Sequence, residues 1–196
     1  MTTKAKLVLD ARAQVGEGAL WYEGQLQWID IEGRSLNFFD PESGKNAVHE
    51  MPQRIGTVVP MDNGRVAVAL EQGIYTYDPG TDTLQHLLTP EGLVKGIRCN
   101  DGKCDPAGRF WVGSMGLDLQ PEVGRLYVVD LDGSCKTVLD KISISNGLVW
   151  SNDRKKFYYI DTPTRRIDIF DYDLATGSID RRRSLVEIPE KLGYPD

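Results

Sequence analysis

The feature of the sequence that most restricts the possible folds is a pattern of residues that occurs four times at similar intervals. Each copy is a glycine that opens a short apolar or mixed segment, followed by a turn and then by an aromatic or valine-rich segment. The glycines are Gly18, Gly56, Gly102 and Gly147, at intervals of 38, 46 and 45 residues. A period of this length is typical of supersecondary units that must stack on one another to bury a hydrophobic core.

The segments between these glycines have the character of β-strands. They alternate apolar and polar side chains or carry aromatic and β-branched runs, and turn residues such as Asp78-Pro79-Gly80 and Asn152-Asp153 separate them. No longer stretch keeps the helical period of 3.6, so the chain is predicted to be nearly all β. Besides the segments that open at the four glycines, the predicted strands are 26–31, 36–40, 65–70, 74–78, 109–115, 125–131, 156–161 and 167–172.

One four-stranded unit per repeat predicts an all-β fold of the β-propeller type, because propeller blades are four-stranded units of about 40–50 residues. A sandwich or a barrel would not need the same phase four times. About four blades are expected in this chain, and the next phase position would fall at 190–197. We therefore expect residues 1–196 to form a single partial propeller domain of a protein that continues beyond Asp196. A complete four-bladed ring is the alternative.

Composition and charge exclude several classes of protein. The chain is 40% hydrophobic and 27% charged, which is typical of a globular domain. Its net charge of −6 argues against a nucleic-acid partner, because such binding depends on a basic surface. The apolar runs are far shorter than the roughly 20 residues of a membrane helix, and the first residues lack the apolar core of a secretion signal. A cytoplasmic protein without a membrane partner is expected, and its oligomeric state stays open.

Oxygen-bearing residues precede three of the four phase glycines. In a propeller, the residue that enters the innermost strand of a blade lies near the central channel, so Glu17, Ile55, Asp101 and Asn146 are expected to converge there. Asp196 stands at the fifth phase position. Carboxylate and amide oxygens gathered in this way suit a hard cation such as Ca²⁺, Mg²⁺ or Mn²⁺. The alternative is that acidic and amide residues before glycine only form turns.

Other hydrolytic sites find little support. The sequence has no G-x-S-x-G nucleophile motif and no phosphate-binding or dinucleotide-binding loop. Its two histidines, His49 and His86, follow the aspartate turns at Asp40 and Asp78, where the outer edge of a blade is expected. A Ser-His-Asp triad or a histidine-rich zinc site is therefore disfavoured, which leaves carboxylate and metal chemistry.

Six motifs in chain order resemble the senescence marker protein, gluconolactonase and luciferin-regenerating enzyme family, which includes regucalcin. The motifs are GEGALW at 16–21, RCNDGKCDPAGR at 98–109, GSM at 113–115, ISNGLVWS at 144–151, FYYID at 157–161 and FDYD at 170–173. The resemblance covers essentially the whole chain. It implies a six-bladed propeller with one divalent cation in the central channel, and hydrolysis of sugar lactones or related esters.

The resemblance also implies a set of metal ligands. Matched motif by motif, the ligands would be Glu17, Asn146 and Asp196. Because a carboxylate beside a metal is well placed to take a proton from the attacking water, Asp196 is also expected to act as the general base. The expected cofactor is one divalent cation. Ca²⁺ is the first expectation, with Zn²⁺, Mg²⁺ and Mn²⁺ as alternatives.

A small-molecule sugar lactone is the partner that the resemblance implies. Arg98 and Asn100 match the pair that contacts substrate in the family, and Asp118 matches an acidic position that meets substrate hydroxyls, although the loop 116–124 is shorter than in some members. Two alternatives share the same sequence features. One is a regucalcin-like calcium-binding regulatory protein without turnover, and the other is a non-catalytic propeller scaffold.

Overall fold

The structure is a computed structural model that describes residues 4–196, and within them sixteen strands form four antiparallel sheets of four. The three helices are short 3₁₀ turns, η1 (Asp62–Gly64), η2 (Thr162–Thr164) and η3 (Glu190–Leu192). Across residues 4–196, no helix has the length and apolar character that crossing a bilayer requires. The strands, sheet by sheet, are β1 (Gly16–Tyr22), β2 (Gln25–Asp30), β3 (Ser35–Asp40) and β4 (Lys45–Glu50); β5 (Ile55–Pro60), β6 (Val66–Leu70), β7 (Gly73–Asp78) and β8 (Thr83–Leu88); β9 (Ile97–Cys104), β10 (Phe110–Gly116), β11 (Gly124–Val129) and β12 (Cys135–Ile142); β13 (Ser145–Trp150), β14 (Lys156–Asp161), β15 (Arg166–Asp173) and β16 (Ser178–Glu187).

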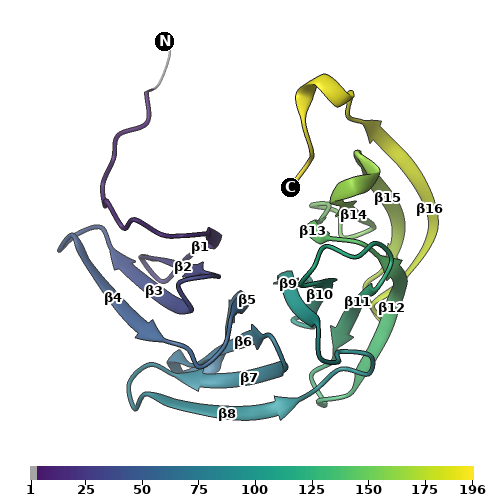
Figure 1. Ribbon diagram of the computed structural model, residues 1–196. Helices are drawn as coiled ribbons and strands as arrows, with labels where there is room; N and C mark the ends of the chain where they lie inside the picture. Colours follow the sequence, from purple (N-terminus) through teal and green to yellow (C-terminus); the bar gives the residue numbers. More distant parts are fainter. Residues whose placement is uncertain (1–3) are drawn as a thin grey trace.

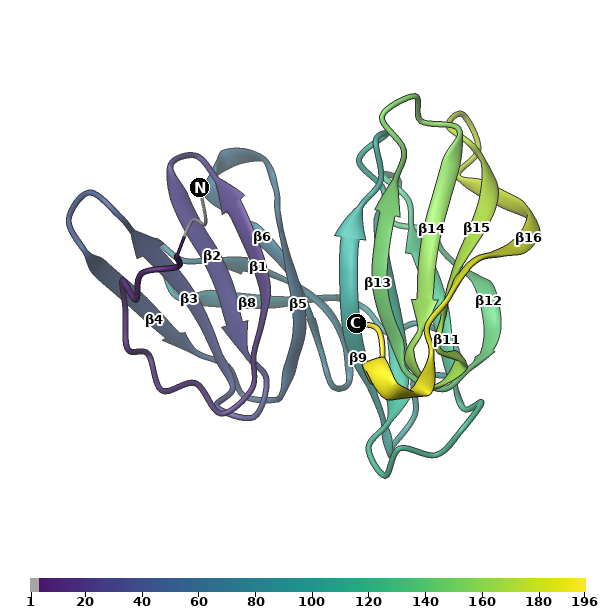
Figure 2. The same cartoon turned by 90° about the horizontal axis from the view of Figure 1, so that it is seen from above.

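Each sheet is an up-and-down meander of four consecutive strands. The four sheets follow one another along an arc, with β1, β5, β9 and β13 on its inner side and β4, β8, β12 and β16 on its outer side (Figure 1). Seen from above, β9 and β13 run side by side (Figure 2). The prediction of an all-β fold with four four-stranded blades is confirmed. The eight predicted strands are the second and third strands of the four sheets.

The hydrophobic core lies between successive sheets and consists of three apolar clusters. Strand β6 shows how one strand serves two of them, because successive side chains of a strand point to opposite faces. Val66, Val68 and Leu70 pack toward the first sheet, whereas Ala67 and Ala69 pack toward the third. All five are buried, so each inner blade is held by apolar contacts on both of its faces.

The phase glycines lie where the innermost strands crowd together. A Cβ atom on Gly56 would lie 2.5 Å from the carbonyl oxygen of Cys99, and one on Gly102 would lie 2.6 Å from that of Trp111. The Thr57 hydroxyl donates to the Gly102 carbonyl at 2.9 Å, which joins β5 directly to β9. Close approach of a neighbouring backbone therefore accounts for the glycines at 56 and 102, whereas Gly18 has a positive φ of 62° and a Cβ atom there would meet only the Ile29 side chain, at 3.3 Å.

Replacing Gly56 by alanine is expected to lower the free energy of unfolding by about 1–3 kcal/mol, the usual cost of overpacking a tight site. The backbone of the neighbouring strand is the obstacle, so a side-chain rotation cannot relieve the clash. Urea unfolding would measure the change. Gly80→Ala is the matched control, because its Cβ would meet only the Asp78 carboxylate at 3.3 Å, and a change within about 0.5 kcal/mol is expected. Equal losses in the two variants would contradict the crowding.

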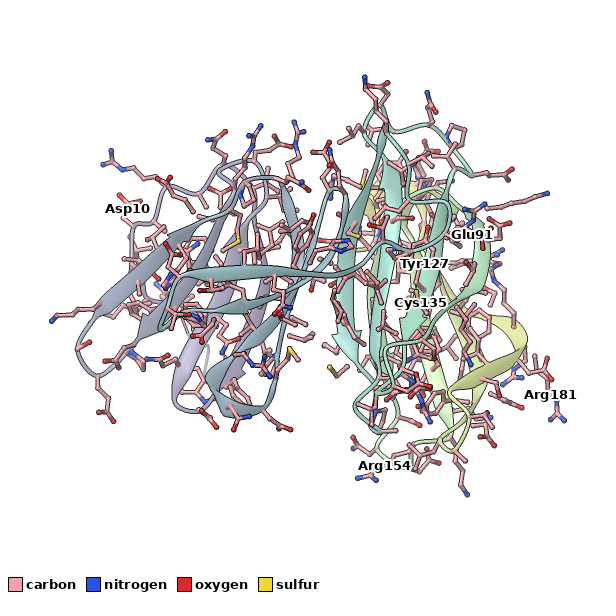
Figure 3. All side chains as sticks on the ribbon, turned by 90° about the horizontal axis from the view of Figure 1, so that it is seen from below. Asp10, Glu91, Tyr127, Cys135, Arg154 and Arg181 are labelled. Carbon is pink, nitrogen blue, oxygen red and sulfur yellow. The ribbon has the colours of Figure 1, made fainter. Side chains whose placement is uncertain are left out.

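The outermost strands carry the two histidines that were expected at the blade edge and a run of three arginines. His49 lies in β4 and His86 in β8. The basic run 181–183 lies in β16, and the Arg181 side chain extends away from the sheet (Figure 3). Arg181 and Arg183 both pair with Asp171 on the neighbouring strand, at 3.1 and 3.0 Å. These arginine pairs lie at the outer edge of the fourth sheet, and all of these residues are apart from the centre of the arc.

Candidate active site

A cavity of about 170 Å³ at the innermost strands is lined by polar residues that are far apart in the sequence. We call this cavity the axial pocket. Its polar residues are Glu17 of β1, Arg98, Asn100 and Asp101 of β9, Asn146 of β13, and Asp196. Val15, Ile31, Met115 and Ile144 complete the lining with apolar surface. A neighbouring cavity of about 260 Å³ shares Glu17, Asp101, Asn146 and Asp196 and adds Lys103. The shared carboxylates and amide thus stand between two hollows at the centre of the arc.

Irregular strand pairing accompanies the predicted ligand positions on β1 and β13. The register shifts between Glu17 and Leu20 where β1 pairs with β2, and between Asn146 and Leu148 where β13 pairs with β14. A β-bulge bends its strand and changes the direction of a side chain, and bulges are common beside active sites. The same shift occurs between Ile55 and Thr57 where β5 pairs with β6, so the irregularity is a feature of the repeat, and on β1 and β13 it lies where Glu17 and Asn146 line the pocket.

The expected convergence is wrong for Ile55. Its side chain is fully buried in the apolar cluster between the first and second sheets, and it does not line the axial pocket. Burying an apolar side chain in a close-packed core is more favourable than exposing it in a polar cavity. In the second blade, Gly56 is the residue that reaches the pocket, so this blade supplies backbone surface in place of a polar side chain.

The C-terminal segment brings Asp196 to the pocket. After η3 the chain turns back toward the centre of the arc (Figure 1). The Thr162 hydroxyl donates to the Pro195 carbonyl at 3.0 Å, which ties this segment to the start of η2. Gly147 makes room for the segment, because a Cβ atom there would lie 3.2 Å from the Asp196 carbonyl oxygen.

Carboxylates dominate the electrostatics of the axial pocket. The pKa of Glu17 is raised above its usual value, first by burial and then by the negative charges of Asp196 and Asp101. The pKa of Asp101 is also raised, mainly by burial, although the Gly102 amide and Lys103 oppose the shift. The pocket therefore concentrates negative charge that a bound cation would stabilise.

The side chains of Arg98, Asn100 and Asn146 form one hydrogen-bonded chain. An Arg98 Nη1–H donates to Asn100 Oδ1 at 2.7 Å. The two Nδ2–H groups of Asn100 donate to the Ser145 carbonyl at 2.7 Å and to Asn146 Oδ1 at 2.8 Å. Both N–H groups of Asn100 are thus engaged by the protein, so its amide holds Asn146 in place. A contact between Asn100 and substrate stays a prediction.

Asp118 lies apart from the axial pocket. It follows β10 and lines a separate hollow of about 830 Å³ together with Lys95, Glu122, Arg125 and Asp140. The structure therefore brings five of the six predicted site residues together and places Asp118 elsewhere. Its contact with substrate hydroxyls remains untested.

The donor set of the axial pocket fits a hard divalent cation. Carboxylate oxygens from Glu17 and Asp196 and the amide oxygen of Asn146 are ligand types that Ca²⁺ and Mg²⁺ prefer. Within residues 4–196, no group of three or more His, Cys, Asp or Glu side chains is arranged to hold a metal ion; the proposed set combines two carboxylates with one amide. The raised pKa of Glu17 supports the fit, because a cation would offset the repulsion among the carboxylates.

Asp101 was expected at the centre from its place before a phase glycine, and it lines both central cavities, although the predicted ligand set gave it no role. Thr162 was absent from the sequence prediction. Thr162 accepts a hydrogen bond from Asn146 Nδ2 at 2.8 Å. No sequence pattern marks Thr162, because its role depends on a contact between η2 and two other segments.

The fold and the site together define a β-propeller-type protein of four-stranded blades with a small acidic pocket at its innermost strands. The family described as the SMP-30/Gluconolactonase/LRE-like region matches residues 15–196. The chain belongs to this family, as its motifs indicated.

Curated relatives agree with this assignment. The Bacillus subtilis (strain 168) protein YvrE, provisionally named a sugar lactone lactonase, is 35% identical over 98% of this chain and 66% of its own length. Regucalcin of Oryctolagus cuniculus is 36% identical over 98% of this chain and 67% of its own length. The chain thus spans about two thirds of the length of the relatives it matches.

Solved structures show the same fold. A luciferin-regenerating enzyme superposes with a TM-score of 0.88 at 33% identity, covering 94% of this chain and 65% of the other. Regucalcin from Agrobacterium tumefaciens str. C58, described as a calcium-binding protein, superposes with a TM-score of 0.89 at 26% identity, covering 94% of this chain and 63% of the other. The blade architecture and its order along the chain are therefore shared with both.

Proposed function

We propose that this chain carries the active site of a metal-dependent sugar lactonase. The observation that supports the proposal most is the convergence of Glu17, Asn146 and Asp196 on one cavity, where the pKa of Glu17 is raised by burial and by its acidic neighbours. The kinship with YvrE, named for sugar lactones, gives the substrate class. A divalent cation held by these three residues would supply Lewis-acid polarisation of the lactone carbonyl.

Residues of the pocket would supply the general base and the groups that orient the substrate. Asp196 accepts a proton from the attacking water, whose oxygen forms the new bond to the carbonyl carbon. The ring C–O bond then breaks, and the proton passes to the departing ring oxygen, which yields a hydroxy carboxylic acid. Arg98 uses Nη1 to hold Asn100 and the Cys99 carbonyl, and its remaining N–H groups are donors for substrate hydroxyls.

A chelator should abolish lactone hydrolysis by this protein. The expected result is rapid opening of a sugar lactone such as glucono-δ-lactone with Ca²⁺, Zn²⁺, Mg²⁺ or Mn²⁺ present, and loss of that activity in EDTA that returns when excess cation is added back. The measurement is proton release at constant pH, corrected for spontaneous opening. Hydrolysis that persists unchanged in EDTA would refute metal dependence.

A calcium-binding protein without turnover is the second candidate. It is favoured by the description of the Agrobacterium tumefaciens relative as a calcium-binding protein, and it would use the same three ligands. The assay that includes the chelator separates the two functions. Tight Ca²⁺ binding with no lactone opening above the spontaneous rate would support the regulatory protein, and absence of both would support a scaffold.

A further inference from the structure

We infer that Thr162 is a positioning residue, which orients the Asn146 amide and anchors the chain beside Asp196; the inference rests on the proposed cation site. Thr162 opens η2, the turn between β14 and β15, and its hydroxyl bonds to two separate segments. It accepts from Asn146 Nδ2 at 2.8 Å and donates to the Pro195 carbonyl at 3.0 Å. One side chain thus contacts one proposed ligand, Asn146, and the residue that precedes another, Asp196.

The direction of these hydrogen bonds follows from chemistry at the Pro195 end. A carbonyl oxygen can only accept, so the single hydroxyl proton of Thr162 must point at Pro195. The Thr162 oxygen is then left as an acceptor, and the group of Asn146 that faces it must be the NH₂. The oxygen of the Asn146 amide is consequently turned the other way, toward Asn100.

The opposite end of the chain imposes the same direction. A guanidinium can only donate, so the oxygen of the Asn100 amide faces Arg98, and its NH₂ faces Asn146 and the Ser145 carbonyl. The Arg98 guanidinium at one end can only donate, and the Pro195 carbonyl at the other can only accept. The Asn146 amide between them therefore has a single orientation. Its oxygen accepts one N–H from Asn100 and keeps a second lone pair, which is the donor that a cation requires.

Without the Thr162 hydroxyl, both proposed ligands would lose a restraint. The Asn146 amide would be held by Asn100 alone, so its oxygen would keep its side but the plane of the amide would no longer be fixed at both ends. The Pro195 carbonyl would lose the hydrogen bond that holds the segment before Asp196. Replacing a residue that hydrogen-bonds to a metal ligand typically lowers metal affinity by about 10–100-fold.

The test uses Thr162→Val, which keeps the shape and removes the hydroxyl, and Thr162→Ser, which keeps the hydroxyl. Thr164→Val is the matched control, because Thr164 lies in the same turn and its hydroxyl bonds only to the Asp161 carbonyl within the turn, at 2.7 Å. Isothermal titration with Ca²⁺ or Mn²⁺ should show Kd raised by about 10–100-fold in Thr162→Val and within about threefold of the original in the other two variants. Thermal unfolding of each cation-free variant checks the fold.

A second measurement needs no cation. In ¹⁵N-labelled cation-free protein, the side-chain NH₂ of Asn146 should exchange slowly with water, and Thr162→Val should lose this protection while Thr164→Val keeps it. Equal exchange in all variants, or an unchanged Kd in Thr162→Val, would overturn the inference. If the original protein binds none of the cations, the proposed function fails, and the exchange measurement alone then decides whether Thr162 positions Asn146.

Discussion

Replacing Glu17 by glutamine is expected to weaken cation binding by at least about a hundredfold and to lower kcat/KM for lactone opening by a similar factor. The loss should exceed the roughly 10–100-fold effect of a partner outside the ligand set, because the substitution removes a proposed ligand charge while keeping its shape. Isothermal titration and the lactone assay would measure the two effects on the same protein.

The stability of the Glu17→Gln protein distinguishes a functional carboxylate from a structural one. The pKa of Glu17 is raised by burial, Asp196 and Asp101, so the folded state disfavours its charged form. Neutral glutamine relieves that repulsion, and the cation-free variant should unfold at the same or a higher urea concentration than the original. Glu23→Gln, at the exposed turn after β1, is the matched control and should leave binding and rate unchanged. Retained binding and activity in Glu17→Gln would refute the proposed site.

Replacing Asp105 by alanine is expected to lower the free energy of unfolding by about 3–5 kcal/mol, the usual cost of removing one member of a buried, hydrogen-bonded ion pair. The Asp105 carboxylate is fully buried between the third and fourth sheets. It accepts hydrogen bonds from the Tyr172 hydroxyl at 2.7 Å and from Trp111 Nε1 and Arg109 Nη1 at 3.1 Å each. The substitution would leave the Arg109 guanidinium, in a side chain only 9% exposed, with Asp130 as its one carboxylate partner at 3.2 Å, and would remove the acceptor of the Tyr172 hydroxyl and of Trp111 Nε1.

The effect of Asp105→Ala should depend on pH. Burial alone would raise the pKa of Asp105, but hydrogen bonds from Tyr172, Trp111 and Arg109 outweigh it and hold the pKa below its ordinary value of 3.8. The ionised carboxylate therefore contributes stability above about pH 4 and loses that contribution as pH falls through the lowered pKa. Urea unfolding at pH 7 and at pH 3 should show a smaller difference between the two proteins at pH 3.

Asp132→Ala is the control for this prediction. Its carboxylate lies at an exposed turn and accepts one hydrogen bond, from the Ser134 amide at 2.8 Å. A loss within about 0.5 kcal/mol is expected, as for most surface substitutions. A comparable loss in both variants would show that the buried network between the third and fourth sheets contributes little.

The strands and their grouping into blades could be read from local patterns. Alternation along 74–78 or 156–161 depends only on neighbouring residues, because successive side chains of a strand face opposite ways. The repetition of Gly18, Gly56, Gly102 and Gly147 at one phase then places equivalent residues at the centre of the arc. Glu17, Asp101 and Asn146 lie together for this reason.

Three-dimensional packing set the features that local patterns leave open. Ile55 occupies the same phase as Glu17 but turns into the core, because apolar surface is more stable there than in the pocket. Asp118 lies on a loop beside the segment around Lys95, and the neighbouring Leu117 amide donates to the Gly96 carbonyl at 2.8 Å. Neither outcome is encoded within a few residues of the position concerned.

The hydrogen-bond partners of the site are likewise a property of the folded chain. Asn100 and Asn146 are 46 residues apart, and Thr162 and Pro195 are 33 apart, so their contacts exist only once the blades are packed and the C-terminal segment has turned inward. The type of each residue and its position in the repeat can be read from the sequence, so the ligand candidates could be named before the structure was known. The orientation of each amide depends on donors and acceptors from other blades, and only folding brings these within reach.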